Sequence, residues 1–215
     1  MCAPVFREIL EQNPDLEIVM VSKRFFGDLF EGIPRLIFKG IDLKEYSGFF
    51  GLRRLAHELT NQYHPDYITD LHDVIRTKIL DKVLAFNGLN VSVIDKGKNE
   101  KKNLTDVWNI SKKQLKPTVE RYADVFRKIG FPVTLSHQLR PSAGKKGGVG
   151  FAPFAQHAGK VLPAEKSFEA ARLISQHKKI YFFGGGKEEV EMLQKWEKEI
   201  PNTCSLAGKL TLKEE

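Results

Sequence analysis

The chain has 215 residues, of which 41% are hydrophobic and 28% charged, as in an ordinary globular protein of one large or two small domains. Its net charge of +7 favours an anionic partner, which could be nucleic acid, a phosphorylated small molecule or an anionic membrane face. The sequence has no apolar run near the ~20 residues of a membrane-spanning helix, no secretory signal and only two cysteines, Cys2 and Cys204, which favours a reducing, cytoplasmic setting without disulfides.

The first 130 residues alternate short apolar segments with amphipathic ones. Strands rich in Val, Ile, Leu and Tyr are predicted at 17–22, 35–40, 67–71 and 90–96. Apolar residues at helical spacing predict helices at 4–13, 50–63, 73–86 and 116–130. This alternation is typical of a parallel sheet with helices packed on its faces.

A second, shorter series follows a glycine-rich segment. Strands are predicted at 149–154, 179–185 and 203–208, with helices at about 165–176 and 187–199. The segment between the two series has the composition of a linker. We therefore expect two α/β domains, residues 1–134 and 149–215, joined by a linker at residues 135–148.

The alternation is interrupted at both ends of the chain. Residue 1 falls inside a predicted helix with no strand before it, and the last residues resemble the opening turn of another helix. The second series is also short compared with a usual domain of ~100–150 residues. We expect the first domain to lack its first strand and the second domain to be incomplete.

Polar residues follow the strands of the first domain, where open α/β sheets bind their ligands. His72 and Asp73 come after the strand at 67–71, with Arg76 one turn into the next helix; Asp73 could equally be a helix cap and Arg76 a surface cation. Arg121 lies near a helix start, where the dipole does not favour a cation, which weakly favours an external anion. A lysine run follows the strand at 90–96 and is either a solvated face or a ligand-facing loop: Lys96, Lys98, Lys101, Lys102, Lys112, Lys113 and Lys116.

Two turns of the second domain carry candidate anion-binding groups. The strand-to-helix turn in GFAPFAQHAGKVLP holds an amide, an imidazole and an ammonium group, from Gln156, His157 and Lys160. The turn GGGKEE lets backbone approach a ligand through its glycines, and its helix N-terminus favours negative charge. Glu188 and Glu189 in that turn either complement the helix dipole or accept hydrogen bonds from ribose hydroxyls.

Six segments, taken together and in order, resemble one known family. They are YITDLHDVIRTKIL, VIDKG, LKPTVERYADVFRKIGFP, APFAQHAGKVLP, FFGGGKEE and SLAGKLTLKEE. The resemblance is to the heptosyltransferase family of glycosyltransferases, which use a nucleotide-activated heptose to build the inner core of bacterial lipopolysaccharide. It implies a GT-B fold, in which two Rossmann-like domains with parallel sheets face each other across a cleft, the acceptor on the first and the nucleotide sugar on the second.

The resemblance also implies roles for individual residues. Lys160 would steady the donor phosphates and Glu188 would hold the ribose, within a donor-binding set of Gln156, His157, Lys160, Gly185, Gly186 and Glu188. Acceptor phosphates would meet a set in the first domain, consisting of His72, Asp73, Arg76, Lys98 and Arg121. The transfer would invert the anomeric centre without a metal or cofactor, in the cytoplasm or peripherally at the anionic inner membrane face.

The acidic base of the family has no counterpart in this sequence. The resemblance places it in a Gly-Asp loop before the segment that Met1 to Val5 match, and places a second donor-phosphate segment after Glu215. Asp28, in FFGDLFEG, follows a different strand and is expected to cap a helix or face solvent. We assign no catalytic residue and expect this chain to be an inactive fragment of a transferase.

Two alternatives stay open at this point. One is another nucleotide-sugar enzyme of the same architecture, such as a hexose or N-acetylglucosamine transferase or an epimerase. The other is a basic module that binds nucleic acid. Because the sequence shows neither an aromatic-rich strand motif nor an obvious recognition helix, we do not expect a nucleic-acid partner.

Overall fold

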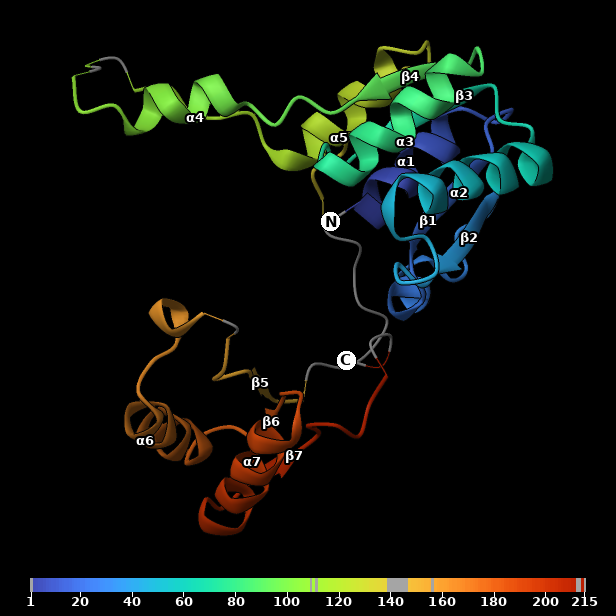
Figure 1. Cartoon of the computed structure of the whole chain (residues 1–215). Helices are drawn as coiled ribbons and strands as arrows, with labels where there is room; N and C mark the ends of the chain where they lie inside the picture. The colour runs from blue at the N-terminus through green and yellow to red at the C-terminus, as the bar shows by residue number, and fades with distance from the viewer. Residues whose placement is uncertain are drawn as a thin grey trace. The chain divides into compact units, whose positions relative to one another are not determined.

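A computed structural model describes residues 2–108, 110, 112–138, 147–155, 157–211 and 214 (Figure 1). The chain divides into two compact units, Met1–Gln138 and Leu139–Glu215. The division falls inside the predicted linker, of which residues 139–146 lie outside the described residues. Among the helices of the described residues, none has the length and apolar character needed to cross a membrane.

The first unit contains every strand and helix predicted for it. Its elements in chain order are α1 (Cys2–Gln12), β1 (Ile18–Lys23), η1 (Arg24–Phe30), β2 (Leu36–Ile41), α2 (Gly48–Tyr63), β3 (Tyr67–Asp70), α3 (Ile75–Phe86), β4 (Asn90–Val93), α4 (Lys98–Thr105) and α5 (Thr118–Arg127). The 3₁₀ helix η1 and the helix α4 were not predicted. The strand predicted at 90–96 ends at Val93, so residues from Ile94 onward form a loop instead.

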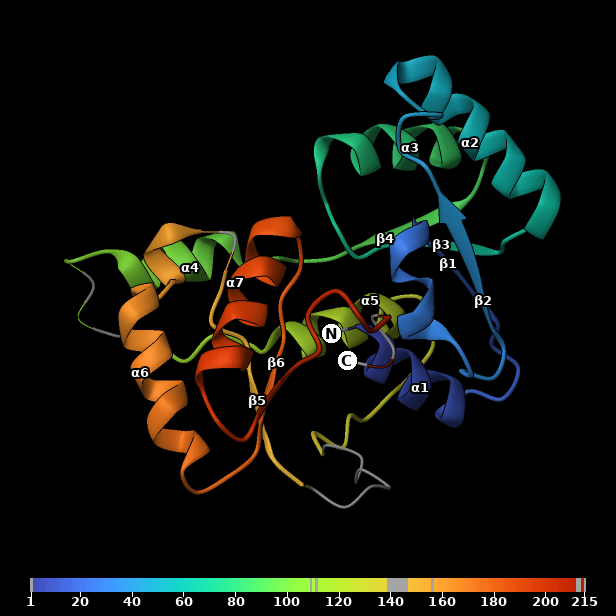
Figure 2. The same cartoon turned by 90° about the horizontal axis from the view of Figure 1, so that it is seen from below.

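The strands of this unit form two parallel pairs. β1 pairs with β2, from Ile18 opposite Leu36 onward, and β3 pairs with β4, from Tyr67 opposite Asn90 onward. Within the described residues no ladder joins the two pairs, so the one continuous parallel sheet that the alternation predicts is divided. Figure 2 shows the strands as a layer between α2 and α3 on one side and α1 and α5 on the other.

The core of the first unit lies between the strands and the layer of α1 and α5. One face of α1 buries Val5, Phe6, Ile9 and Leu10, whose spacing gives a continuous apolar stripe. The Phe6 ring packs against those of Phe30 and Phe126, at centroid distances of 6.0 and 5.9 Å. The same core buries Val133 and Leu135, which extends the unit beyond its expected end at residue 134.

The second unit has a three-stranded parallel sheet. Its elements are β5 (Val149–Phe151), η2 (Ala158–Lys160), α6 (Ala164–Ser175), β6 (Ile180–Phe182), α7 (Lys187–Glu199) and β7 (Thr203–Ser205), with the strands in the order β5-β6-β7. All three strands are shorter than predicted because the ladders end at Phe151, Phe182 and Ser205. The helix expected at the end of the chain falls largely on residues 212–213 and 215, outside the described residues.

Candidate functional site

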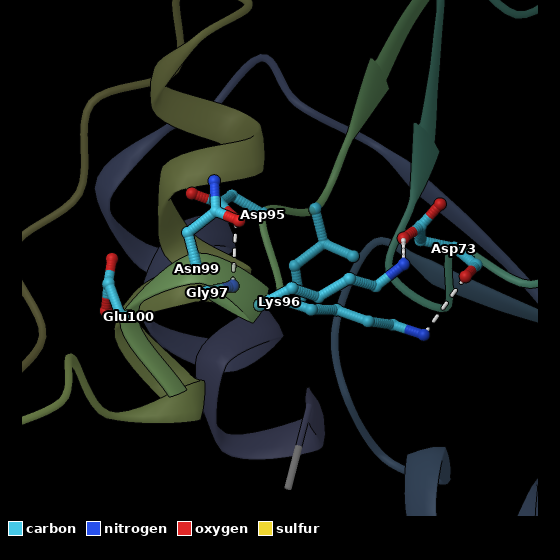
Figure 3. Close-up of a pocket in the computed structure, with 8 residues that line it drawn as sticks. Asp73, Asp95, Lys96, Gly97, Asn99 and Glu100 are labelled. Atoms are coloured by element: carbon cyan, nitrogen blue, oxygen red, sulfur yellow. Dashed lines mark hydrogen bonds and ion pairs between the residues drawn. The ribbon is translucent and has the colours of Figure 1, made fainter. Parts of the chain in front are cut away.

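A hollow of about 420 Å³ lies at the carboxyl ends of β3 and β4 in the first unit (Figure 3). It is lined by Asp73, Ile94, Asp95, Lys96, Gly97, Lys98, Asn99 and Glu100. All but one of these residues belong to the loop after β4 and the first turn of α4. Ligands of open α/β folds bind at this end of the strands. The hollow is therefore the candidate site of this unit, and we call it the β3–β4 pocket.

The turn after β3 is built around the buried carboxylate of Asp70, which is 5% exposed. Its Oδ1 accepts the backbone N–H of His72 at 2.7 Å, and its Oδ2 accepts the N–H of Asp73 at 2.9 Å. Asp73 takes up a left-handed backbone conformation, with φ of 44°. These contacts fix the position of Asp73 in the wall of the pocket.

Three lysines surround Asp73. The Nζ atoms of Lys78 and Lys98 lie 3.2 and 3.8 Å from its two carboxylate oxygens. Lys96 donates a hydrogen bond to its backbone carbonyl at 3.0 Å. The hydrogen bond from Lys78 lowers the pKa of Asp73, and the charges of Lys78, Lys98 and Lys96 add to this effect. The lining of the pocket thus combines two ammonium groups, of Lys96 and Lys98, with three carboxylates, of Asp73, Asp95 and Glu100.

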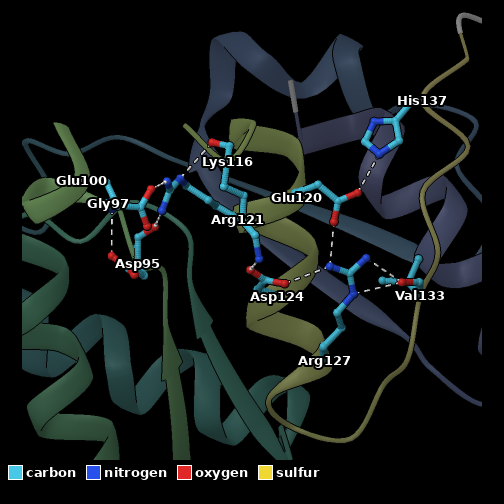
Figure 4. Close-up of polar contacts among 10 residues, drawn as sticks. All are labelled: Asp95, Gly97, Glu100, Lys116, Glu120, Arg121, Asp124, Arg127, Val133 and His137. Carbon is cyan, nitrogen blue, oxygen red and sulfur yellow. Dashed lines mark hydrogen bonds and ion pairs between the residues drawn. The ribbon is translucent and has the colours of Figure 1, made fainter. Parts of the chain in front are cut away.

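Arg121 lies against the same loop and is only 6% exposed. Its guanidinium donates to the carbonyls of Asp95 and Lys116 at 3.1 and 3.2 Å, and to Glu100 Oε2 at 2.5 Å (Figure 4). Gly97 packs directly on the guanidinium, and a Cβ added there would lie 2.5 Å from Nη2. These internal partners account for a cation near the start of α5 without an external anion.

The structure brings only part of the predicted acceptor-binding set together. Asp73 and Lys98 share the pocket, and Arg121 supports its loop. His72 and Arg76 are exposed, and their side chains have no hydrogen bond or ion pair within the described part of the chain. The acceptor-binding roles of all five residues stay predictions. The sequence analysis missed Asp70, Lys78 and Asp95, although an acidic residue at or just after the end of a strand could have indicated the first and third.

Asp81, on α3, is coupled to the turn around Asp70. Its pKa is raised to about 7, chiefly by burial, then by the charge of Asp70 and a hydrogen bond with that residue, and also by the charge of Asp73. Near neutral pH the carboxyl of Asp81 is thus partly protonated and donates a hydrogen bond to Asp70. No pattern in the sequence distinguishes Asp81 from a surface residue of the helix.

We expect the free energy of unfolding of the first unit to fall as pH rises from about 4 to about 7, because Asp81 then loses the proton that it shares with Asp70. A folded pKa above the unfolded value of about 3.9 means that the folded state binds the proton more tightly, so the benefit is complete below pH ~4 and is lost as pH passes 7. Asp81→Asn keeps a donor without the charge. Since Asp81 is half-exposed, we expect this variant to gain only about 1 kcal/mol at pH 8 relative to its effect at pH 5.

Urea denaturation at both pH values measures this difference. The control is Asp66→Asn, which removes an exposed aspartate just before β3 and should change stability equally at the two pH values. An effect of Asp81→Asn that does not depend on pH would contradict the proton shared with Asp70.

In the second unit, the predicted donor-binding residues follow β5 and β6. These strands are parallel neighbours, so the segments after them leave the sheet at the same edge. His157 and Lys160 are exposed, in and beside η2, where the N–H of Lys160 donates to the His157 carbonyl at 2.9 Å. The Lys160 ammonium has no partner among the residues that the structure describes. Gln156 lies outside the described residues.

Two glutamates at the start of α7, Glu188 and Glu189, are equivalent in the sequence but differ in their contacts. Glu189 Oε2 accepts the backbone N–H of Gly185 at 2.9 Å, which ties the turn to the helix. Gly186 follows with φ of +84°, a conformation that L side chains rarely adopt. Glu188 is exposed and has no partner in the described residues, so its carboxylate is available to a ligand.

Comparison with known proteins identifies the class as an α/β glycosyltransferase. The sequence model of glycosyltransferase family 9 (heptosyltransferase) matches residues 52–215. The chain belongs to this family. A search of curated protein sequences found no match.

Solved structures of the same family share the fold. A glycosyl transferase family 9 protein from Veillonella parvula has a TM-score of 0.70 and 17% identity, over 99% of this chain and 67% of its own. E. coli ADP-heptose lps heptosyltransferase II has a TM-score of 0.62 and 17% identity, over 99% and 70%. E. coli heptosyltransferase WaaC with ADP has a TM-score of 0.67 and 13% identity, over 98% and 71%.

These findings confirm the predicted fold class, an α/β protein with parallel sheets of the GT-B type. They also confirm that the chain is a glycosyltransferase by family. Among the alternatives that the sequence left open, the epimerase and the nucleic-acid-binding module gain no support from them.

Proposed function

We propose that the protein serves to transfer a heptose-like sugar, with inversion, from a nucleotide-sugar donor to a lipopolysaccharide core or another phosphorylated glycolipid. The match of the family model over residues 52–215 carries this proposal. Two of the similar solved structures are described as an ADP-heptose heptosyltransferase and as a heptosyltransferase with ADP, which supports ADP-heptose as the donor. The reaction uses no metal or cofactor besides the nucleotide sugar, and takes place in the cytoplasm or peripherally at the inner membrane face.

The β3–β4 pocket suits the acceptor because its polar groups match a phosphorylated sugar. The carboxylates of Asp73, Asp95 and Glu100 can accept hydrogen bonds from sugar hydroxyls. The ammonium groups of Lys96 and Lys98 can donate charge-assisted hydrogen bonds to a phosphate. His72 and Arg76, exposed after β3 and early in α3, are proposed to add further donors.

The donor is assigned to the second unit. Lys160 is proposed to hold the diphosphate with His157 and Gln156. Gly185, whose N–H is engaged by Glu189, is proposed to let the donor approach the backbone, and Gly186 to offer its N–H at the start of α7, where the helix dipole favours an anion. Because Glu189 is engaged in the turn, we assign the ribose hydroxyls to Glu188.

We expect Lys160→Ala to weaken ADP-heptose binding about ten- to a hundred-and-fifty-fold. This range corresponds to the ~1.5–3 kcal/mol of one charge-assisted hydrogen bond. Isothermal titration calorimetry measures the affinity. The control is Lys166→Ala, which removes another exposed lysine of the same unit and should leave binding unchanged. Equal affinities for the wild type and Lys160→Ala would remove Lys160 from the donor site.

The same titration separates the proposal from its remaining alternatives. Tighter binding of a nucleotide hexose or N-acetylglucosamine than of ADP-heptose would favour one of those transferases. An affinity that is lost on adding a chelator would contradict metal-free binding of the donor. We expect this chain to be inactive; if turnover is nevertheless detected, NMR of the anomeric configuration of the product tests inversion.

A further inference from the structure

A projecting segment of the first unit, residues 98–116, has features that neither proposed substrate site uses. We call it the lysine arm; its residues 109 and 111 lie outside the described ones. α4 forms its first part and buries no residue. In both Figure 1 and Figure 2, α4 extends away from α1, α2 and α3 of the same unit.

Both ends of the lysine arm are fixed to the body of the unit. At the start, Glu100 accepts a hydrogen bond from the buried Arg121 at 2.5 Å. At the end, Lys116 Nζ lies 2.6 Å from Asp124 Oδ2 on α5. Between these points, Lys112 Nζ donates to the carbonyls of Leu104 and Asp106 at 2.8 and 2.5 Å, which closes the C-terminus of α4. These contacts hold the two ends of the lysine arm against the rest of the unit.

The exposed apolar side chains of the arm follow one another closely in the sequence after α4, and we call Val107, Trp108 and Ile110 the apolar tip. Val107 and Trp108 are each 88% exposed and Ile110 is 99% exposed, while Leu104 on the adjoining turn of α4 is 37% exposed. Burial of apolar surface is favourable by about 25 cal/mol per Å². Water-exposed aliphatic and indole groups this close together in sequence therefore indicate a surface that is covered in use.

Lysines precede and follow this apolar tip in the sequence. Residues 98–116 contain six lysines and two acidic residues, Glu100 and Asp106, which gives a local net charge of +4. The side-chain ammonium groups of three of the six lysines have no hydrogen bond or ion pair among the residues described, namely those of Lys101, Lys102 and Lys113. They flank the tip on both sides in sequence.

We infer that the lysine arm docks on an anionic lipid bilayer. Val107, Trp108 and Ile110 enter the interfacial region, where Trp is favoured because one end of its ring system is apolar and its N–H stays hydrated. Lys101, Lys102 and Lys113 meet the lipid phosphates, and each lysine near an anionic surface contributes about 1 kcal/mol. Nucleic acid fits less well, because bases stack on aromatic rings and the tip offers one indole between two aliphatic residues.

Docking on lipid requires neither a donor nor an acceptor, so it stands independently of the proposed function. Its consequence for that function follows from sequence continuity: the arm begins at Lys98 to Glu100, which also line the β3–β4 pocket. A docked arm would hold that pocket near the membrane surface, where a glycolipid acceptor presents its sugar.

The test uses the full chain and vesicles of phosphatidylcholine with or without phosphatidylglycerol. We expect sedimentation with the anionic vesicles only, reversal by salt, and a blue shift of tryptophan emission that the Trp108→Phe variant lacks. Trp108→Ser combined with Ile110→Ser should weaken vesicle binding about tenfold or more. The matched control, Phe86→Ser, removes a side chain that is 93% exposed at the end of α3 and should bind like the wild type.

The charge contribution is tested by a second matched pair of variants. Replacing Lys101, Lys102 and Lys113 together by glutamine should weaken binding to anionic vesicles about a hundredfold, from three contributions of about 1 kcal/mol. Replacing Lys82, Lys128 and Lys166 together by glutamine removes the same charge from exposed positions elsewhere, and should change binding less than about threefold if location matters.

Three results would overturn the inference. Equal losses of vesicle affinity in the two triple variants would show that only the net charge of the protein matters, and not the position of the lysines. Tight binding of single-stranded RNA without binding to vesicles would make the arm a nucleic-acid surface. A Trp108 that is shielded from a soluble quencher without vesicles would mean that protein covers the tip. Unchanged thermal unfolding of each variant shows that its fold is intact. The vesicle test does not depend on the outcome of the ADP-heptose titration, which tests the proposed function.

Discussion

Replacing Gly97 by alanine should lower the free energy of unfolding of the first unit by about 2–4 kcal/mol and disrupt the loop that lines the β3–β4 pocket. Gly97 has φ of +61°, a left-handed conformation that costs a residue with a Cβ about 1–2 kcal/mol. In addition, the new Cβ would lie 2.5, 2.6 and 2.7 Å from three atoms of the Arg121 guanidinium. Contacts this short require the guanidinium or the loop to move.

Moving either the guanidinium or the loop costs free energy. Arg121 is held by the carbonyls of Asp95 and Lys116 and by Glu100, so displacing it breaks hydrogen bonds of a buried charge. Gly88→Ala is the matched control, because Gly88 has φ of +87° and nothing within 4 Å of an added Cβ. It should cost only the backbone strain of about 1–2 kcal/mol. Urea denaturation compares the two variants, and equal losses would show that the contact with Arg121 contributes nothing.

The sequence allowed the helices and strands to be predicted wherever one face is buried. α1 shows this best, because Val5, Phe6, Ile9 and Leu10 form the apolar stripe that packs in the core. α4 has no buried residue and therefore no stripe, so its lysines were taken for a loop. The division of the first unit's strands into two pairs was also missed. Periodicity indicates which residues are extended, but pairing depends on which backbones come close enough to bond.

The loops of the candidate site could be predicted from the sequence, whereas the contacts within it could not. The rule that ligands bind after the strands of an α/β sheet led to the loops that hold Asp73 and Lys98, which do share a pocket. Arg121 could not be understood from the sequence, because two of its partners are backbone carbonyls, which every residue carries. Glu188 and Glu189 were equivalent until the structure showed which one bonds to Gly185.

Trp196 of α7 holds together the core of the second unit and the segment that leads to the donor residues. It is 5% exposed, and its ring lies 5.6, 5.9 and 6.2 Å from those of Phe168, Phe182 and Phe154. Phe154 belongs to the stretch between β5 and η2, which continues to His157 and Lys160. The indole thus connects α6, β6 and this stretch around one side chain.

Trp196→Ala should destabilise the second unit by about 3–5 kcal/mol, as truncation of a buried aromatic residue does. A unit of 77 residues, Leu139–Glu215, has a total stability of roughly 4–12 kcal/mol, so a quarter of it or more would be lost. Met192→Ala is the control on the same helix: Met192 is 37% exposed, and its truncation should cost less than about 1 kcal/mol.

Hydrogen exchange followed by mass spectrometry reads the two units separately in the intact chain. Protection should fall in peptides from α6, β6 and α7, together with ADP-heptose affinity, while α1 and α5 keep theirs. Protection of α7 that survives the substitution would contradict the role of Trp196, and an equal loss in α1 would show that the two units unfold together.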